Sequence, residues 1–207
     1  MDSKALFKLQ YGVFVLGTKE GEVVNACITN TCIQVTSSPK TRVAIAVINT
    51  NYTCELIKKS GVFAVTVLDE SVSNELIANF GYQSGRNVNK FLSYPPEFDK
   101  NGCPYLKQSA AAVLSCRVES SQDLGSHTLF IAEVEEAEIL GDKTPVTYSY
   151  YQSNIKPKKA EAKTEKKITG WKCKICGYTY EGEKLPEDFV CPWCGHGPED
   201  FEPIYAD

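Results

Sequence analysis

Four cysteines in the last forty residues or so have the spacing of a metal site. Cys173 and Cys176 form one Cys-x-x-Cys pair, and Cys191 and Cys194 form a second pair after residues 177–190. Each pair directs its two sulfurs toward one point, and two facing pairs make a tetrahedral four-thiolate site, which suits zinc or iron. The sequence therefore predicts one metal ion held by these cysteines.

The neighbours of the cysteines favour iron, although zinc ribbons use the same pairs. Gly177 and Gly195 each follow the second cysteine of a pair. Because glycine has no Cβ, it lets backbone N–H groups turn toward the sulfurs. Such hydrogen bonds tune the potential of an iron–thiolate centre. The surrounding aromatic residues, which would stabilise so small a unit, are Trp171, Tyr178, Tyr180, Phe189, Trp193 and Phe201.

Residues 171–204 resemble rubredoxin. The motifs that carry the resemblance are C-x-x-C-G-Y, D-F-V-C-P-x-C-G and D-F-E-P, and the stretch between the pairs resembles the shorter form found in appended rubredoxin domains. The resemblance implies a small, zinc-ribbon-like iron domain over residues 168–207, with one Fe ion bound by four Cys and carrying single electrons. A structural zinc ribbon remains the alternative.

Composition and charge exclude several classes of protein. The chain has 207 residues, enough for one substantial and one small domain, and a net charge of −4 that gives no reason to expect nucleic-acid binding. No apolar run approaches the length of a membrane span. Nine cysteines without an apolar signal segment predict a reducing, cytoplasmic environment instead of a disulfide framework.

A change of composition divides the chain. Residues 152–167 contain six Lys, two Glu and almost nothing apolar, so they predict a flexible linker between domains at 1–151 and 168–207. The last domain holds three Lys against eight acidic residues. That excess of negative charge suits a redox partner protein with a basic docking patch.

The first domain is predicted to be mainly β, with a few helices. Strands are expected at residues 11–17, 22–28, 32–36, 42–48, 62–68, 110–119 and 127–140. Helices are expected at 3–9, at 51–59 and at 73–80, the second being capped by Asn51 or Thr53 and ended by Gly61. Many strands with tight turns indicate a barrel instead of a doubly wound sheet. No Gly-x-Gly-x-x-Gly motif is present, which argues against a Rossmann nucleotide site.

Three polar segments of this domain are candidates for a ligand site. Residues 25–39 are rich in small polar side chains where two strands meet. Residues 49–53 lie at a helix N-terminus, where free N–H groups and hydroxyls suit a phosphate. Residues 84–90 add Arg86 and Lys90 as possible phosphate partners. Capping and turn chemistry is the alternative explanation for the same residues.

Together these segments resemble the flavin reductase-like FMN-binding split barrel. The similarity runs over residues 1–151 and rests on Y-G-V-F-V-L-G-T, on T-N-T-C before S-S-P, on N-Y-T-C-E-L-I-K and on G-S-H-T-L-F-I-A-E-V. It implies an FMN at the interface of a homodimer. It also implies that Thr29, Asn30, Thr31 and Cys32 line the isoalloxazine. The residues implied to hold the ribityl chain and phosphate are Asn49, Asn51, Thr53, Arg86 and Lys90.

His127 opens a predicted strand beside this pocket. A structural role and a catalytic contact with the flavin or an entering nicotinamide are both open for it. His196 follows the second metal pair, where no ligand position is vacant. Tyr148, Tyr150 and Tyr151 end the barrel and either pack in its core or contact the flavin or a dimer mate.

The two predicted sites suggest a short electron-transfer chain. A hydride donor delivers two electrons and a single iron accepts one, whereas a flavin takes a pair and releases it singly. The domain order resembles the high-molecular-weight rubredoxins, which are associated with flavodiiron oxygen or nitric-oxide reductases. We therefore expect an oxidoreductase that passes electrons from NAD(P)H or a reductase through FMN to the iron, and on to such an acceptor. The alternatives are a flavin reductase with an accessory metal domain and a non-enzymatic flavin-binding module with a structural zinc ribbon.

Overall fold

The computed structural model describes residues 5, 8–157 and 168–205. The chain divides into two compact units, Met1–Pro157 and Lys158–Asp207. Most of the helix expected at residues 3–9 lies outside the described residues. The linker residues 158–167 lie wholly outside them. Among the described helices, none has both the length and the apolar character that crossing a bilayer requires. All nine cysteines are described, and none of them forms a disulfide.

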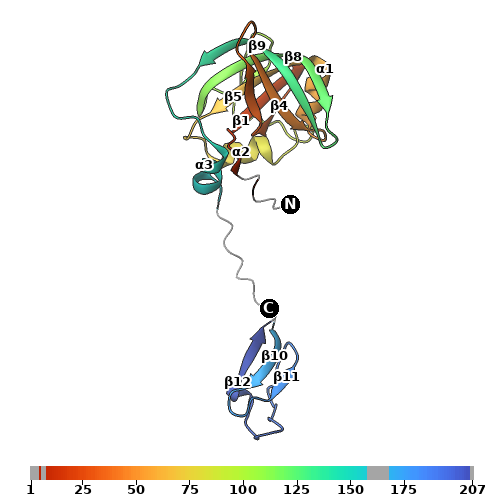
Figure 1. Ribbon diagram of the computed structural model, residues 1–207, viewed down its shortest axis with the longest axis vertical. Helices are drawn as coiled ribbons and strands as arrows, with labels where there is room; N and C mark the ends of the chain where they lie inside the picture. The colour runs from red at the N-terminus through yellow and green to blue at the C-terminus, as the bar shows by residue number, and fades with distance from the viewer. Residues whose placement is uncertain (1–4, 6–7, 158–167, 206–207) are drawn as a thin grey trace. The chain divides into compact units, whose positions relative to one another are not determined.

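One antiparallel sheet of seven strands forms the first unit (Figure 1). The strand order is β2-β1-β5-β8-β9-β4-β3. The strands are β1 (Phe14–Glu20), β2 (Val23–Thr29), β3 (Cys32–Thr36), β4 (Arg42–Ile48), β5 (Val62–Leu68), β8 (Ala110–Asp123) and β9 (His127–Ile139). A separate two-stranded sheet pairs β6 (Glu97–Phe98) with β7 (Pro104–Tyr105).

This sheet curls into a barrel that stays open along one seam. β2 and β3 are the two ends of the strand order and do not pair with each other, yet only Asn30 and Thr31 separate them in the chain. The three residue steps from Thr29 to Cys32 span at most about 11 Å, so the two edges of the sheet lie close together there. Cys27 of β2, Ile45 of β4 and Phe130 of β9 share one hydrophobic interior. The expected mainly β split barrel is confirmed.

Two capped helices pack on the barrel. α1 (Tyr52–Ser60) begins after Asn51, whose side chain accepts a hydrogen bond from the N–H of Thr53 at 2.9 Å, and it ends at Gly61. Of the two predicted caps, Asn51 is therefore the one used. α2 (Asn74–Gly81) begins after a serine cap. α1 packs against β1 and β2, and α2 packs against β2.

The predicted element bounds hold for some strands and are shifted for others. The strands expected at 32–36, 42–48 and 62–68 have the predicted limits. β1 instead runs three residues later than the expected 11–17, because Glu20 pairs with Val23 across a two-residue turn. Two short helical turns after β9 were not predicted: α3 (Tyr148–Tyr150) and the π-helical η2 (Tyr151–Ile155). Part of the segment assigned to the linker is therefore helical, and the compact unit extends to Pro157.

The second unit is a three-stranded antiparallel sheet with two cysteine loops. Its order is β11-β10-β12, formed by β11 (Thr179–Glu181), β10 (Ile168–Cys173) and β12 (Phe201–Tyr205), with the 3-10 turn η3 (Pro198–Asp200) before the last strand. The ring of Phe189 lies 4.8 Å from that of Tyr180 and 5.4 Å from that of Phe201, measured between centroids. Aromatic packing and cysteines thus form the core of this small unit.

Candidate functional site

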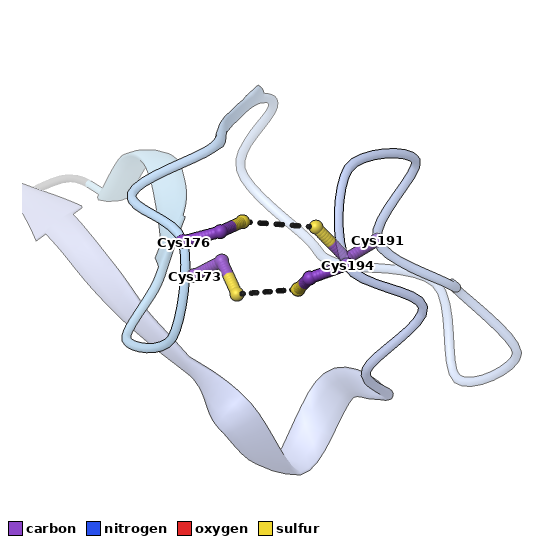
Figure 2. Close-up of side chains that lie close together, drawn as sticks. All are labelled: Cys173, Cys176, Cys191 and Cys194. Carbon is purple, nitrogen blue, oxygen red and sulfur yellow. Dashed lines mark hydrogen bonds between the residues drawn. The ribbon is translucent and has the colours of Figure 1, made fainter.

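The four cysteines of the second unit converge on one point, and Figure 2 shows their sulfurs facing one another in two pairs. The Sγ atoms of Cys173 and Cys194 are 3.7 Å apart, and those of Cys176 and Cys191 are 3.5 Å apart. All four sulfurs lie within 4.8 Å of one another. A metal bonded to four sulfurs at about 2.3 Å separates them by about 3.8 Å. The arrangement therefore fits one tetrahedral metal ion.

Backbone N–H groups reach the sulfurs in the same pattern in both halves of this site. In each pair, the first sulfur accepts from the N–H groups two and three residues further on, and the second sulfur from the N–H two residues further on. Gly177 and Gly195 permit this because their φ angles of 80° and 73° are left-handed. Burial alone would raise the pKa of Cys191, but backbone donors and neighbouring thiols bring it to about 7. Backbone donors also act to lower the pKa of Cys194, but burial and the neighbouring thiols raise it to about 12, so negative charge is shared unequally among the sulfurs.

Exposed apolar side chains lie next to the metal ligands. Ile175, Val190 and Trp193 are 56%, 62% and 71% exposed. The ring of Trp193 also meets that of Tyr178 edge-on, with centroids 5.4 Å apart. Exposed apolar residues beside a metal site suit contact with another protein. His196 is a neighbour of the fourth ligand, with its Nδ1 lying 3.1 Å from the carbonyl oxygen of Cys194.

The first unit contains a cavity of about 430 Å³ at the open seam of the barrel. This volume is typical of cofactor sites. Apolar side chains from several strands form part of its wall. Five of the residues predicted from the sequence also line it: Thr29, Asn30, Thr31, Asn51 and His127.

The fold explains why these five residues meet. Thr29 ends β2, and Asn30 and Thr31 connect it to β3 across the seam. Asn51 is the cap of α1 and follows β4 closely. His127 opens β9 and is paired with Ile48 at the end of β4, and its Nδ1 lies 2.8 Å from the hydroxyl of Ser126. Residues far apart in the sequence therefore gather at one end of the barrel.

Lys90, a predicted phosphate partner, is 4% exposed. Its Nζ donates hydrogen bonds to the carbonyl oxygens of Ala26 and Phe80, both at 2.9 Å. Burial lowers the pKa of Lys90. In this arrangement Lys90 is a structural cation that joins β2 to the C-terminal end of α2, and it does not line the cavity at the seam.

Arg86 likewise has partners elsewhere. It forms an ion pair with Glu55, and its guanidinium lies 4.3 Å from the centroid of the Tyr52 ring. Arg86 and Lys90 border a different cavity of about 440 Å³. The structure therefore separates both predicted phosphate partners from the cavity that Thr29–Thr31 lines.

The remaining predicted residues also make structural contacts. Cys32 packs against the barrel core, and burial raises the pKa of its thiol to about 12. Thr53 is fully buried and accepts a hydrogen bond from the Asn25 amide at 2.9 Å. Asn49 donates hydrogen bonds to Asp123 and to the carbonyl of Gly125 at the turn between β8 and β9. None of the three lines the seam cavity described here.

Besides the apolar wall, sequence reasoning missed three polar side chains that line the cavity: Tyr82, Gln152 and Lys156. The hydroxyl of Tyr82 lies 2.7 Å from that of Tyr151, which lines the cavity together with Tyr148. Burial raises the pKa of Tyr151, and its hydrogen bond with Tyr82 acts in the same direction. Gln152 and Lys156 are four residues apart, which is a helical spacing. The lysine-rich composition of this segment instead predicted a linker.

Comparisons with known proteins identify a family for each of the two units. Residues 6–159 match the family described as "Flavin reductase like domain", and residues 171–202 match "Rubrerythrin, rubredoxin-like domain". A high molecular weight rubredoxin from Moorella thermoacetica is 34% identical, over 99% of this chain and 100% of its own. A ferric-chelate reductase (NAD(P)H) from Archaeoglobus fulgidus is 34% identical over 73% of this chain and 89% of its own.

Solved structures of other proteins have a similar fold. The flavin reductase PheA2 in its native state superposes with a TM-score of 0.60 at 28% identity, covering 71% of this chain and 93% of that one. A flavin-binding fold and a rubredoxin-like four-cysteine site together imply a flavin and an iron ion. The chain belongs to the flavin reductase-like family and carries a rubredoxin-like domain after its barrel.

Proposed function

We propose that this protein passes electrons from NAD(P)H or a separate reductase through FMN to a four-cysteine iron centre, and from there to another protein. One observation carries the proposal: a single chain holds both a cavity at the seam of a flavin reductase-like barrel and a four-thiolate site. The Archaeoglobus relative is a ferric-chelate reductase (NAD(P)H), which supports a nicotinamide donor.

The residues of the cavity fit a flavin. Val13, Ile28 and Ile77 offer apolar surface for a planar ring, and the Thr29–Thr31 connection offers hydroxyl, amide and backbone groups to its polar edge. When bound, a flavin takes two electrons from a hydride donor and releases them one at a time. We assign to His127 the contact with the flavin or the nicotinamide, because it borders the cavity while Ser126 holds its ring.

The partners proposed for this protein follow from exposed surfaces. β3 is an edge strand, and its Ile33 and Val35 are 58% and 45% exposed, which suits a homodimer formed through the barrel. In the second unit, acidic residues and the exposed Trp193 beside Cys194 suit an electron acceptor with a basic docking surface. A flavodiiron oxygen or nitric-oxide reductase is the acceptor that we propose.

An anaerobic stopped-flow experiment with NADH tests this function. We expect the FMN band to bleach first and the visible bands of the ferric site to bleach afterwards. Cys194→Ser is the control, because it removes one metal ligand in a separate compact unit. This variant should lose the iron bands but retain its flavin and the NADH-dependent bleaching.

Two results would favour the alternatives. Flavin that bleaches while the iron stays oxidised on the catalytic timescale would indicate a flavin reductase with an accessory metal domain. A purified protein whose metal is zinc, with no red colour, would indicate a structural zinc ribbon.

A further inference from the structure

The cavity at the barrel seam has a lysine in its wall and no acidic residue. Of the described residues that line it, Lys156 is the one Lys or Arg, and neither Asp nor Glu is among them. Lys156 also lines an adjoining cavity of about 770 Å³, which shares Asn30, Thr31 and Tyr148 with the first. The lysine therefore lies where the two cavities adjoin.

The ammonium group of Lys156 has no anionic partner among the described residues. Its Nζ donates to the Oε1 of Gln152 at 3.3 Å, and no ion pair between described residues includes it. Arg86, by contrast, is neutralised by Glu55. An unpaired cation beside walls without carboxylates creates a positive potential in the cavity. That potential favours an anionic ligand.

The backbone of Lys156 is anchored beside the cavity. The N–H of Lys156 donates to the carbonyl of Tyr151 at 2.8 Å and closes the π-helical turn η2. Tyr151 is 4% exposed, and its hydroxyl is hydrogen-bonded to that of Tyr82. π-helical turns occur frequently at functional sites. Here the turn brings a residue at the very end of the compact unit to the ligand cavity.

We propose that Lys156 binds a phosphate group of the ligand that occupies this cavity, an inference that rests on the proposed function. An ammonium group donates strong, charge-assisted hydrogen bonds to phosphate oxygens. The phosphate belongs either to the FMN or to the nicotinamide dinucleotide. Both sources share the chemistry that Lys156 recognises. Asn30, Thr31 and Gln152 lie in the walls of both cavities as further polar contacts.

Flavin titrations of the full-length protein test this inference. After removal of bound flavin, dissociation constants are measured by fluorescence quenching for FMN and for riboflavin, which has the same ring without the phosphate. We expect Lys156→Gln to weaken FMN binding by about tenfold, the lower end for a charge-assisted hydrogen bond, and to leave riboflavin binding unchanged. Lys156→Arg should restore most of the affinity. Lys143→Gln removes an exposed lysine that does not line the cavity and should match the wild type.

A second measurement, the NADH dependence of flavin bleaching, identifies the source of the phosphate. If FMN binding is unchanged but the NADH concentration for half-maximal flavin bleaching rises about tenfold, Lys156 binds the dinucleotide and the inference holds. If neither quantity changes, or if FMN and riboflavin lose affinity equally, the inference is wrong while the proposed function remains. A wild-type protein that binds neither flavin would overturn both.

Discussion

At the scale of single residues, the surroundings of a lysine decide its role in this barrel. Lys90 is buried and bonded to two carbonyls, whereas Lys156 is exposed and lacks an anionic partner among the described residues. The first holds two elements together. Lys156 has its charge available to a ligand.

We expect Lys90→Met to lower the free energy of unfolding by about 2 kcal/mol or more, because it leaves two buried carbonyls without a donor. Denaturant unfolding followed by far-ultraviolet circular dichroism measures this change. The ratio of FMN to riboflavin affinity should stay at the wild-type value, with Lys143→Met as the surface control. A variant with unchanged stability and a selective loss of FMN binding would show instead that Lys90 binds the phosphate.

At the scale of elements, the seam between β2 and β3 and the start of α1 build the cavity. The edges of the sheet meet at the Asn30–Thr31 connection, and the α1 cap Asn51 comes soon after Ile48, the last residue of β4. Register shifts in the long β8–β9 pair accompany the bending of the sheet. Asn51 therefore has two functions, since it caps a helix and lines the cavity.

A pair of cap variants separates these two functions. Asn51→Ala and Ser73→Ala each remove a side chain that caps a helix, of α1 and of α2 respectively. Each should lower the free energy of unfolding by about 1 kcal/mol. Only Asn51→Ala should also weaken flavin binding, because Ser73 does not line the cavity. Equal flavin affinities in the two variants would remove Asn51 from the binding site.

At the scale of the whole molecule, two units with separate cores share one chain. The lysine-rich stretch between them tethers the iron unit to the flavin unit. A short tether gives the second partner an effective concentration on the order of 1 mM. Transfer between the two sites should therefore not depend on encounters between molecules.

This arrangement predicts the kinetic order of iron reduction. In stopped-flow experiments with excess NADH, the rate constant for bleaching of the iron bands should be the same across a series of protein concentrations. Mixing separately expressed barrel and metal units should instead give a rate that rises with their concentration. A rate for the intact chain that is proportional to protein concentration would contradict transfer within the tethered assembly.

Sequence alone determined the features that depend on local spacing. The Cys-x-x-Cys pairs with their glycines, the helix start at Asn51 or Thr53 and the strands at 32–36, 42–48 and 62–68 all depend on residues close together in the chain. The assignment of Thr29–Thr31 and His127 to one pocket came from a family resemblance, and the fold places them around one cavity.

Only the tertiary structure decided which lysine faces that cavity. The carbonyls that hold Lys90 come from β2 and from the end of α2, and no local pattern links these positions. Lys156 lies in a stretch whose composition predicts a linker, yet the π-helical turn before it packs Tyr151 into the core. Composition describes a segment as an average, whereas the partners of each charge are set by contacts between distant parts of the chain.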